Sequence, residues 1–287
     1  MTGQIPHRHI DARLLGPLSI DRYVDRGEDL PGGGALNMAY HWAQRGLRCE
    51  MISRVADDGA ELFEGFLERN DIAHTPDLVQ PGTACTVDIR FADDRQPVMD
   101  NFVEGVLSDF RLTDAEAERV SSGVPAHLVL VDVIDDELHR LAGDRPLDDA
   151  RLTGDFLSFR HFTPERFSAS MQWLEIGFIG WPGDHDDALI GELIARTLTA
   201  RTVLVITFGS SGVRVVDARG PEPADRWFDV TAVPVVGTTV GCGDAFIAAF
   251  LAAWYRTGEL DRAGTAGREL GATATAWERP LPDSAYR

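Results

Sequence analysis

Strand-like and helix-like segments alternate along most of the chain, and this order predicts an α/β fold with a mainly parallel, doubly wound sheet flanked by helices. Continuous apolar runs at 126–133, 174–179 and 202–207 have the composition of strands that are buried on both faces. With 287 residues and 44% apolar content, the chain can bury one large core. We therefore expect a single domain over residues 1–287.

Helices are expected between these strands, where apolar and small residues recur at helical spacing. Ligands in doubly wound folds collect at the carboxyl ends of the strands, so the functional site is expected at that edge of the sheet. The expected helices cover residues 37–45, 59–70, 113–121, 187–197 and 244–256.

Two stretches, about 20–32 and 83–103, break the alternation and read as half-buried hairpin strands. The second turns on the step from Asp93 to Asp94, as hairpins do. These strands predict a small β-sheet beside the main sheet. A small exposed sheet with one apolar face needs a partner, so a homodimer through this sheet is expected.

The segment 235–256 is a turn of small residues that delivers one carboxylate, Asp244, to the start of an apolar helix. Gly241 and Gly243 let a ligand come close to the backbone. The first amides of a helix lack internal partners and carry the positive end of its dipole, which suits a phosphate or an oxyanion. Asp244 could then accept a proton from an attacking hydroxyl. Alternatively, Asp244 is an ordinary N-cap or first-turn residue.

A second glycine-rich segment, 31–46, leads into a helix whose first turn holds Asn37. An amide side chain both donates and accepts hydrogen bonds, which suits sugar hydroxyls approaching over the bare backbone of Gly32 and Gly33. The alternative is a glycine loop between a strand and a helix, with a solvent-facing Asn.

Taken together, the two segments resemble the signatures of the ribokinase-like (PfkB) carbohydrate kinases: Gly-Gly-x-x-x-Asn, and Asp-Thr-x-Gly-Ala-Gly-Asp-x-Phe. Segment 16–21 looks like the family's first strand with its sugar-binding Asp, and segment 205–212 looks like the strand and loop that hold the nucleotide phosphates. The pattern is closest to members of the fructoselysine 6-kinase type, on segments 104–110 and 178–187. The resemblance covers most of the chain and implies that the small sheet is a lid over the sugar.

The resemblance implies a phosphotransferase that moves a phosphoryl group from ATP, with Mg²⁺, to a hydroxyl of a small sugar or sugar derivative, such as a fructosamine. Asp244 would be the base, held ionised by the helix N-terminus, and the Gly241, Cys242 and Gly243 amides would form the anion hole. The acceptor would be bound by Asp21, Gly32, Gly33 and Asn37, with Glu104 suited to an amine, and the nucleotide by Thr207, Gly209 and Gly212.

The sequence departs from the family pattern at several places. Thr238 stands where the second signature usually opens with Asp, and Val240 replaces a threonine. The family's Asn-x-x-Glu motif, which organises magnesium through water, has no clean counterpart. The segment 180–184 occupies the expected place and leaves Asp184, Asp186 or Asp187 as substitutes, although these acids could equally form a solvated loop ahead of a helix.

Charge and composition limit the classes of partner that the protein could bind. The net charge of −19 and a pI near 4.7 argue against nucleic acid and anionic membranes. A nucleotide triphosphate must then be received by backbone amides, helix N-termini and a magnesium ion. The N-terminus shows no apolar targeting segment, so a cytoplasmic protein is expected.

The cysteines Cys49, Cys85 and Cys242 are far apart and show no metal spacing. Cys49 and Cys85 are expected in the core. Cys242 stands at a helix start in place of the family's alanine, and is expected first as a packing residue and second as an oxidation-sensitive switch.

Two further functions stay open. A nucleoside kinase could stack a base on lid aromatics such as Tyr23, Phe91 and Phe102, although isolated aromatics there also suit a lid core. A sugar-binding or regulatory protein could retain the scaffold without catalysis. Retention of Asp244 between its glycines favours the kinase, because a binding module has no use for a base.

Overall fold

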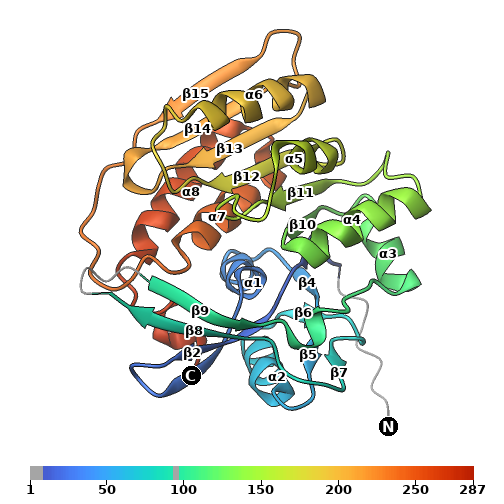
Figure 1. Cartoon of the computed structure of the whole chain (residues 1–287), viewed down its shortest axis with the longest axis vertical. Coiled ribbons are helices and arrows are strands. Elements are labelled where there is room, and N and C mark those ends of the chain that lie inside the picture. Colours follow the sequence, from blue (N-terminus) through green and yellow to red (C-terminus); the bar gives the residue numbers. More distant parts are fainter. Residues whose placement is uncertain (1–8, 93–96) are drawn as a thin grey trace.

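A nine-stranded sheet forms the centre of the protein in the computed structural model, which describes residues 9–92 and 97–287 (Figure 1). Strand order is β15-β14-β13-β12-β11-β10-β1-β4-β6, parallel from β6 to β13 and antiparallel from β13 to β15. This confirms the doubly wound, mainly parallel architecture. The strands are β1 Ala12–Leu15, β4 Cys49–Ile52, β6 Ala73–His74, β10 Ala126–Val129, β11 Leu152–Asp155, β12 Ile176–Gly180, β13 Val203–Thr207, β14 Val213–Asp217 and β15 Ala224–Phe228.

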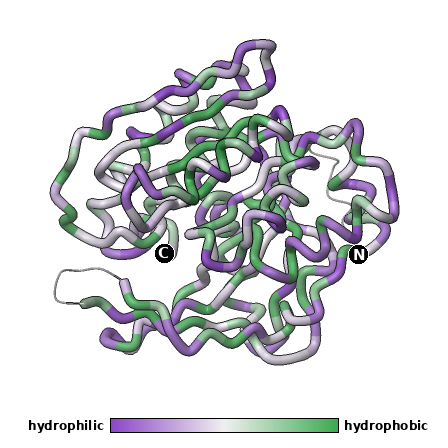
Figure 2. Tube along the Cα trace, turned by 45° about the horizontal axis from the view of Figure 1, so that its top comes forward, coloured by the Kyte–Doolittle hydropathy of each residue, from purple (hydrophilic) through white to green (hydrophobic). Residues whose placement is uncertain are grey.

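Helices cover both faces of this sheet, because its strands are apolar on both sides. In β13, Val203 and Val205 belong to one buried cluster, and Leu204 and Ile206 to the other. Figure 2 shows hydrophobic residues along the interior strands and hydrophilic ones in the outer loops. The first cluster includes α1 Gly34–Gln44, α2 Ala60–Arg69, α7 Cys242–Thr257 and α8 Leu260–Ala274; the second includes α3 Asp114–Val120, α4 Asp132–Asp144, α5 Pro164–Met171 and α6 Ala188–Ala200.

The predicted small sheet is present as a separate four-stranded sheet, and we call it the lid. Its order is β3-β2-β8-β9, with β2 and β8 parallel and the outer pairs antiparallel. The expected turn at Asp93 and Asp94 lies outside the described residues. The lid strands are β2 Ser19–Tyr23, β3 Glu28–Gly32, β8 Thr86–Phe91 and β9 Pro97–Val103; a further pair joins β5 Val55–Ala56 to β7 Val79–Gln80.

Two predicted boundaries are wrong. The first strand of the main sheet is β1, which ends before Gly16, and Asp21 lies in the lid instead, because Pro17 has no amide to pair. The strand expected over 126–133 stops at Val129, and α4 begins at Asp132, where acids in the first turn favour a helix start.

The last residues were expected to be irregular, and apart from the short 3-10 helix η3 (Asp283–Ala285) they are. They are nevertheless packed, since Leu281 and Ala285 are fully buried. Two other 3-10 turns are η1 Gly105–Leu107 and η2 Gly209–Ser211. Within the described ranges, no helix is both long and apolar enough to span a bilayer.

Candidate active site

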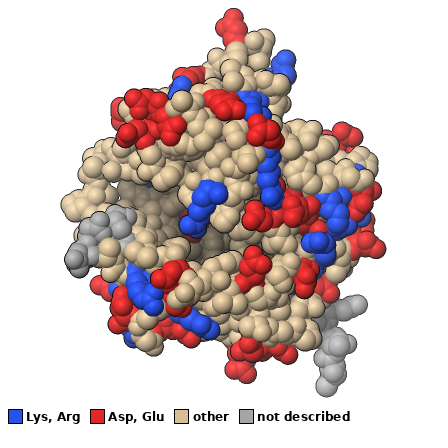
Figure 3. Space-filling model, viewed as in Figure 1, with Lys and Arg blue, Asp and Glu red and all other residues tan. Residues whose placement is uncertain are grey.

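Asp244 and Asn37 meet where α7 and α1 begin. The Asn37 Nδ2 donates a hydrogen bond of 2.8 Å to the Asp244 Oδ2, joining residues that lie far apart in the sequence. Helix α7 starts at Cys242, so Asp244 lies in its first turn, as expected, and Gly241 is the N-cap with φ of 79°. Figure 3, drawn in the view of Figure 1, shows a hollow between the lid and the main sheet with its helices.

The triple glycine brings the lid and α7 together. A Cβ on Gly32 would lie 2.1 Å from an Asp21 oxygen, and one on Gly34 would lie 3.0 Å from the Asp244 Oδ1. Gly33 has φ of 103°, and its open side faces the Pro17 carbonyl. The space above Gly32 is therefore filled by a protein carboxylate rather than left bare for a sugar, and Gly34, not singled out by the sequence, touches Asp244.

A third carboxylate joins this cluster. Asp155 ends β11 at the carboxyl edge of the sheet, and its Oδ1 accepts a hydrogen bond from the Leu157 amide at 2.8 Å. Its charge interacts with Asp244, as does that of Asp21. Sequence reasoning missed Asp155; the available signal was an acid directly after a short strand. We call Asp21, Asp155 and Asp244 the carboxylate cluster.

The carboxylate cluster has no positive partner. Within the described part of the chain, none of its members forms an ion pair. Burial, with the charge of Asp244 added, raises the pKa of Asp155 from 3.8 to about 7, against the Leu157 amide. Burial and Asp244 likewise raise the pKa of Asp21 to about 7, against a 2.8 Å hydrogen bond from Ser19. Such unpaired, buried acids indicate a functional site.

The surroundings of Asp244 shift its pKa. Burial raises that pKa, and the hydrogen bond from Asn37 offsets part of the effect, so the ionised Asp244 expected at the helix N-terminus stays a prediction. A general base works best when its pKa lies near the working pH, so a raised pKa suits Asp244 to that role.

The expected anion hole is partly assembled. The amides of Gly241 and Gly243 make no hydrogen bond to any described residue, as free donors must. The Cys242 amide instead donates to the Thr239 carbonyl at 3.3 Å. Thr238, where the family has Asp, is buried and accepts from the Val240 amide at 3.1 Å, so it shapes the turn.

The expected nucleotide residues lie at the same edge of the sheet. Thr207 ends β13 beside Gly180 of β12, and the Gly180 amide donates to the Leu157 carbonyl next to Asp155 at 2.7 Å. Gly209, the first residue of η2, and Gly212, which follows its last residue, both have positive φ. A Cβ on Gly212 would lie 2.3 Å from the Trp227 ring, so this ring covers one side of the loop.

Glu104 is exposed at the start of η1, near the lid. Burial raises the pKa of Cys85 to about 12, and the charges of Asp21 and Glu104 add to the effect. The Cys85 thiol is therefore within electrostatic reach of both acids.

One residue of the acidic loop before α6 has a structural role. Asp187 caps α6 by accepting from the Leu189 amide at 2.9 Å, as the solvated-loop alternative expected. Asp184 and Asp186 are exposed, and the described residues contain no group of three or more metal-binding side chains. Asp184 as a metal ligand stays a prediction.

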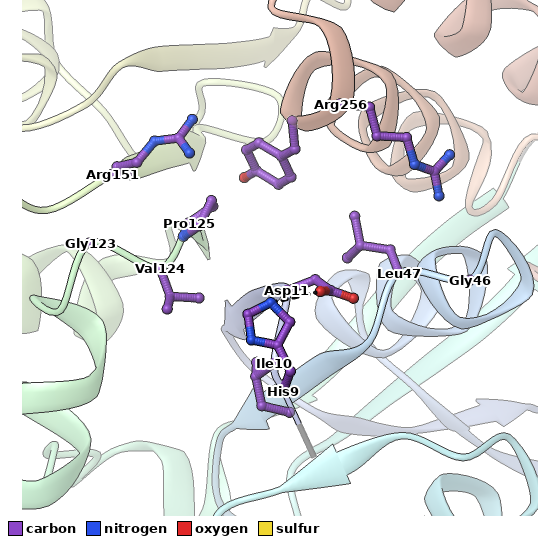
Figure 4. Close-up of a pocket in the computed structure, with 11 residues that line it drawn as sticks. His9, Ile10, Asp11, Gly46, Leu47, Gly123, Val124, Pro125, Arg151 and Arg256 are labelled. Carbon is purple, nitrogen blue, oxygen red and sulfur yellow. Dashed lines mark ion pairs between the residues drawn. The ribbon is translucent and has the colours of Figure 1, made fainter. Parts of the chain in front are cut away.

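A separate pocket of about 470 Å³ lies at the opposite edge of the main sheet (Figure 4). Its lining includes Asp11, Arg151 and Arg256, close to the amino ends of β1, β10 and β11. These charges already have partners: Arg151 pairs with Glu175 at 3.2 Å, and Arg256 donates to the Arg45 carbonyl at 2.5 Å. We therefore place the candidate site at the carboxyl ends instead.

Comparison with known proteins agrees with this geometry. The model of the pfkB family carbohydrate kinases matches residues 181–278. A fructoselysine 6-kinase of Shigella flexneri is 24% identical over 90% of this chain and 94% of its own. An ATP-dependent ribose-1-phosphate kinase of Halopiger xanaduensis is 26% identical over 86% of this chain and 81% of its own length. The nucleoside kinase of Methanocaldococcus jannaschii, an archaeal member of the ribokinase family, has the same fold, with a TM-score of 0.74, 16% identity and 95% coverage of both chains.

The doubly wound sheet with its lid, and the carboxylates at its carboxyl edge, define a phosphotransferase of the ribokinase fold. The chain is similar to the pfkB family carbohydrate kinases over residues 181–278, and to the kinases named above over most of its length.

Proposed function

We propose that this protein transfers the γ-phosphoryl group of ATP to a hydroxyl of a small sugar derivative, with Asp244 as the general base. The observation that carries the proposal is the Asp244 carboxylate, held by Asn37 and placed in the same helical turn as the free Gly243 amide. A base and an oxyanion donor side by side are what phosphoryl transfer to an alcohol requires.

In the proposed step each residue of the site has a defined role. The acceptor hydroxyl donates its hydrogen bond to Asp244 while Asp21 and Asn37 hold neighbouring hydroxyls. As the acceptor oxygen forms its bond to the γ-phosphorus, the bond from that phosphorus to the bridging oxygen breaks and ADP leaves. Asp244 takes the hydroxyl proton, and the amides of Gly241 and Gly243 donate to the transferring oxygens. Thr207, Gly209 and Gly212 would line the nucleotide.

Two members of the carboxylate cluster could contribute to holding magnesium, although the described residues form no site of three or more metal-binding side chains. Asp155 and Asp244 offer unpaired oxygen ligands, and Mg²⁺ is commonly held by one or two carboxylates together with water and nucleotide phosphates. The metal would neutralise charge on the phosphates during transfer. We propose Asp155 as the better candidate than the exposed Asp184, because only Asp155 is coupled to the base.

The same unpaired acids favour an acceptor that carries an amine. A cationic group near Asp21 and Glu104 would offset negative charge that the described residues leave uncompensated, whereas a phosphorylated acceptor would add to it. A fructosamine has such a group, and one relative is named a fructoselysine 6-kinase. We therefore propose a fructosamine over a sugar phosphate.

A nucleoside is the less favoured acceptor. Tyr23 is 1% exposed and stacks on Phe91 with ring centroids 6.1 Å apart, so both belong to the lid core. Phe102 is 56% exposed on the edge strand β9. None of the three presents a free face to the carboxylate cluster that the structure records.

We also propose a homodimer through the lid. Strand β9 ends the lid sheet and exposes apolar side chains, and a long apolar edge needs a covering partner. The exposed side chains are Val98, Met99, Phe102 and Val103. Sedimentation of the free protein, with Phe102→Glu as the dissociating variant, tests this.

A turnover screen tests the proposed reaction. ADP release from ATP and Mg²⁺ is measured with free sugars, fructosamines, sugar phosphates and nucleosides. Asp244→Asn should lower kcat about 10²- to 10⁴-fold with the productive acceptor. Asp149→Asn, the same change at an exposed acid outside the proposed site, is the matched control and should retain activity. Tight sugar binding without ADP release would instead identify a sugar-binding protein.

A further inference from the structure

The C-terminal residues 277–287, here called the strap, run from the end of α8 to the lid. In Figure 1 the C-terminus lies beside the lid, on the other side of the molecule from β15. The strap is anchored along this path: the Asn70 Nδ2 donates to the Ala285 carbonyl at 3.1 Å, and the Tyr286 ring lies 5.9 Å from the Phe66 ring. Such contacts make it part of the fold rather than a loose tail.

The first part of the strap supports the loop that precedes the anion hole. The Thr238 amide donates to the Trp277 carbonyl at 2.8 Å. A Cβ on Gly237 would lie 1.8 Å from that same carbonyl oxygen, and one on Gly241 would lie 2.8 Å from the Pro280 Cα. The loop 237–241 and the strap are therefore in backbone contact, and neither can shift without the other.

The middle of the strap holds the lid. Arg279 reaches the Glu28 carboxylate with Nη2 at 2.7 and 2.8 Å and with Nε at 3.2 Å, in a forked ion pair. Both side chains are mostly buried, at 20% and 32% exposed, so this pair is stronger than a surface one. Glu28 opens β3, and β3 ends at Gly32, against Asp21.

The end of the strap reaches the acceptor side of the site. Tyr286 packs on the lid core with Tyr23 and Ile89. Leu30 of the same cluster is the register partner of Asp21 in the lid, and the charge of Asp21 adds to the burial that raises the pKa of Tyr286. The strap thus contacts two parts of the proposed site: the lid, which carries Asp21, and the loop before the anion hole.

We propose that Arg279 is a positioning residue for phosphoryl transfer, which fixes the acceptor-binding lid relative to the anion-hole loop by gripping Glu28. This inference rests on the proposed function for its kinetic consequences. The acceptor oxygen and the γ-phosphorus must meet at a set distance, and they are held by units that join through the strap. Loss of the grip lets the lid shift, and misplacement of about 1 Å can cost roughly a hundredfold in rate.

Kinetics of Arg279→Met, which keeps the aliphatic stem, test the proposal. We expect kcat/KM for the acceptor to fall about 10- to 100-fold, with a smaller change in KM for ATP. Arg279→Lys, which keeps one contact, should be intermediate. The matched control is Arg287→Met, also in the strap. Among the described residues Arg287 pairs with Asp283, at 3.1 Å, and is 78% exposed, so the change should be neutral. Arg279 also pairs with Asp283, at 2.5 Å, so this control removes one pair to Asp283 and leaves the Glu28 pair intact.

A double-mutant cycle separates positioning from general damage. Glu28→Ala should cause the same loss as Arg279→Met, and the double variant should be no worse than either single one. Additive losses, or kcat/KM for the acceptor within twofold of the parent in Arg279→Met, would overturn the proposal.

Hydrogen exchange tests the strap without turnover. In Arg279→Met, amides in 28–32 and 237–241 should exchange at least several-fold faster, while those of β12 and β13 stay unchanged. Unchanged exchange in both segments would refute the coupling even if the variant is inactive. If the parent protein shows no kinase activity but the exchange responds as expected, the proposed function fails and the coupling stands.

Discussion

Two buried carboxylate groups in this protein differ in how they are satisfied. Glu116, 1% exposed at the start of α3, accepts hydrogen bonds from Arg54 at 2.6 and 3.0 Å, from Thr75 at 2.7 Å and from the Thr113 amide at 3.0 Å. Asp155, 5% exposed, accepts from one backbone amide. The two sites are similarly deep, yet only one is complete within the protein.

The pKa values follow the same division. Burial tends to raise the pKa of Glu116, but the hydrogen bonds from Arg54, Thr75 and Thr113 outweigh it, so that pKa lies below its ordinary value. In the carboxylate cluster burial outweighs the single hydrogen bond that each member accepts, and the pKa values rise. A satisfied buried acid stabilises the fold, whereas an unsatisfied one is left for a ligand, a metal or a proton.

Removing the partner of the satisfied acid should have the largest effect on stability. Arg54→Met leaves Glu116 buried and unpaired, and should lower the free energy of unfolding by about 3–5 kcal/mol. Urea unfolding measures this. Arg262→Met, which breaks the exposed pair between Arg262 and Glu259, is the control and should change little. A loss below about 1 kcal/mol in Arg54→Met would mean that the two groups of carboxylates do not differ as argued.

Neutralising an unsatisfied acid should, in contrast, lower the activity without lowering the stability. Asp155→Asn keeps the oxygen that accepts from Leu157, and should lower kcat about 10- to 100-fold and weaken the response to Mg²⁺. Its urea midpoint should be equal or higher, because an uncompensated charge is gone. Asp149→Asn, an exposed acid just ahead of the same strand, is the control for both measurements. Full activity in Asp155→Asn would assign Asp155 a purely structural role.

The pH dependence of stability should carry the sign of the raised pKa values. The folded protein holds a proton on Asp21 more tightly than the unfolded chain does, since the pKa rises from 3.8 to about 7. The contribution of Asp21 is therefore fully present below about pH 4 and is lost as pH rises toward 7. Glu116 contributes in the opposite direction, and its part is lost only as pH falls through its lowered pKa.

Asp21→Asn removes the first contribution and tests the sign. Between pH 5 and 8, its free energy of unfolding should fall less than that of the parent protein, by at least about 1 kcal/mol. Urea titrations at both pH values measure the difference. An equal or steeper fall in the variant would show that Asp21 is not held protonated by its surroundings.

The contrast also separates what the sequence predicts from what it does not. Asp244 and Asn37 could be predicted because each follows glycines at a helix start, a local pattern that tertiary packing did not change. Asp155 could not, because its strand has four residues, among them Thr, Gly and Asp, and lacks a clear apolar period. Its importance comes from Asp244, which approaches only in the folded chain.

The lid shows the same limit at the level of strands. Alternating residues predicted that 20–32 and 83–103 form strands, but the parallel pairing of β2 with β8 depends on long-range register. Segment 16–21 was misplaced for this reason. The strap was missed because its residues contact the lid and the anion-hole loop through single side chains and carbonyls, which leave no periodic pattern.

Cys242 should show the smallest effect, and it tests the alternative of an oxidation-sensitive switch at the anion hole. Burial, with the charge of Asp244 added, raises the pKa of its thiol to about 12, so the reactive thiolate is scarce at neutral pH. Cys242→Ala should keep kcat within about twofold, since its side chain mainly fills space beside the Thr238 carbonyl. Thiol-reagent kinetics on the native protein should be slow, and fast in urea, where Cys49 and Cys85 react as well. Rapid inactivation of the parent protein by peroxide, absent in Cys242→Ala, would instead establish the switch.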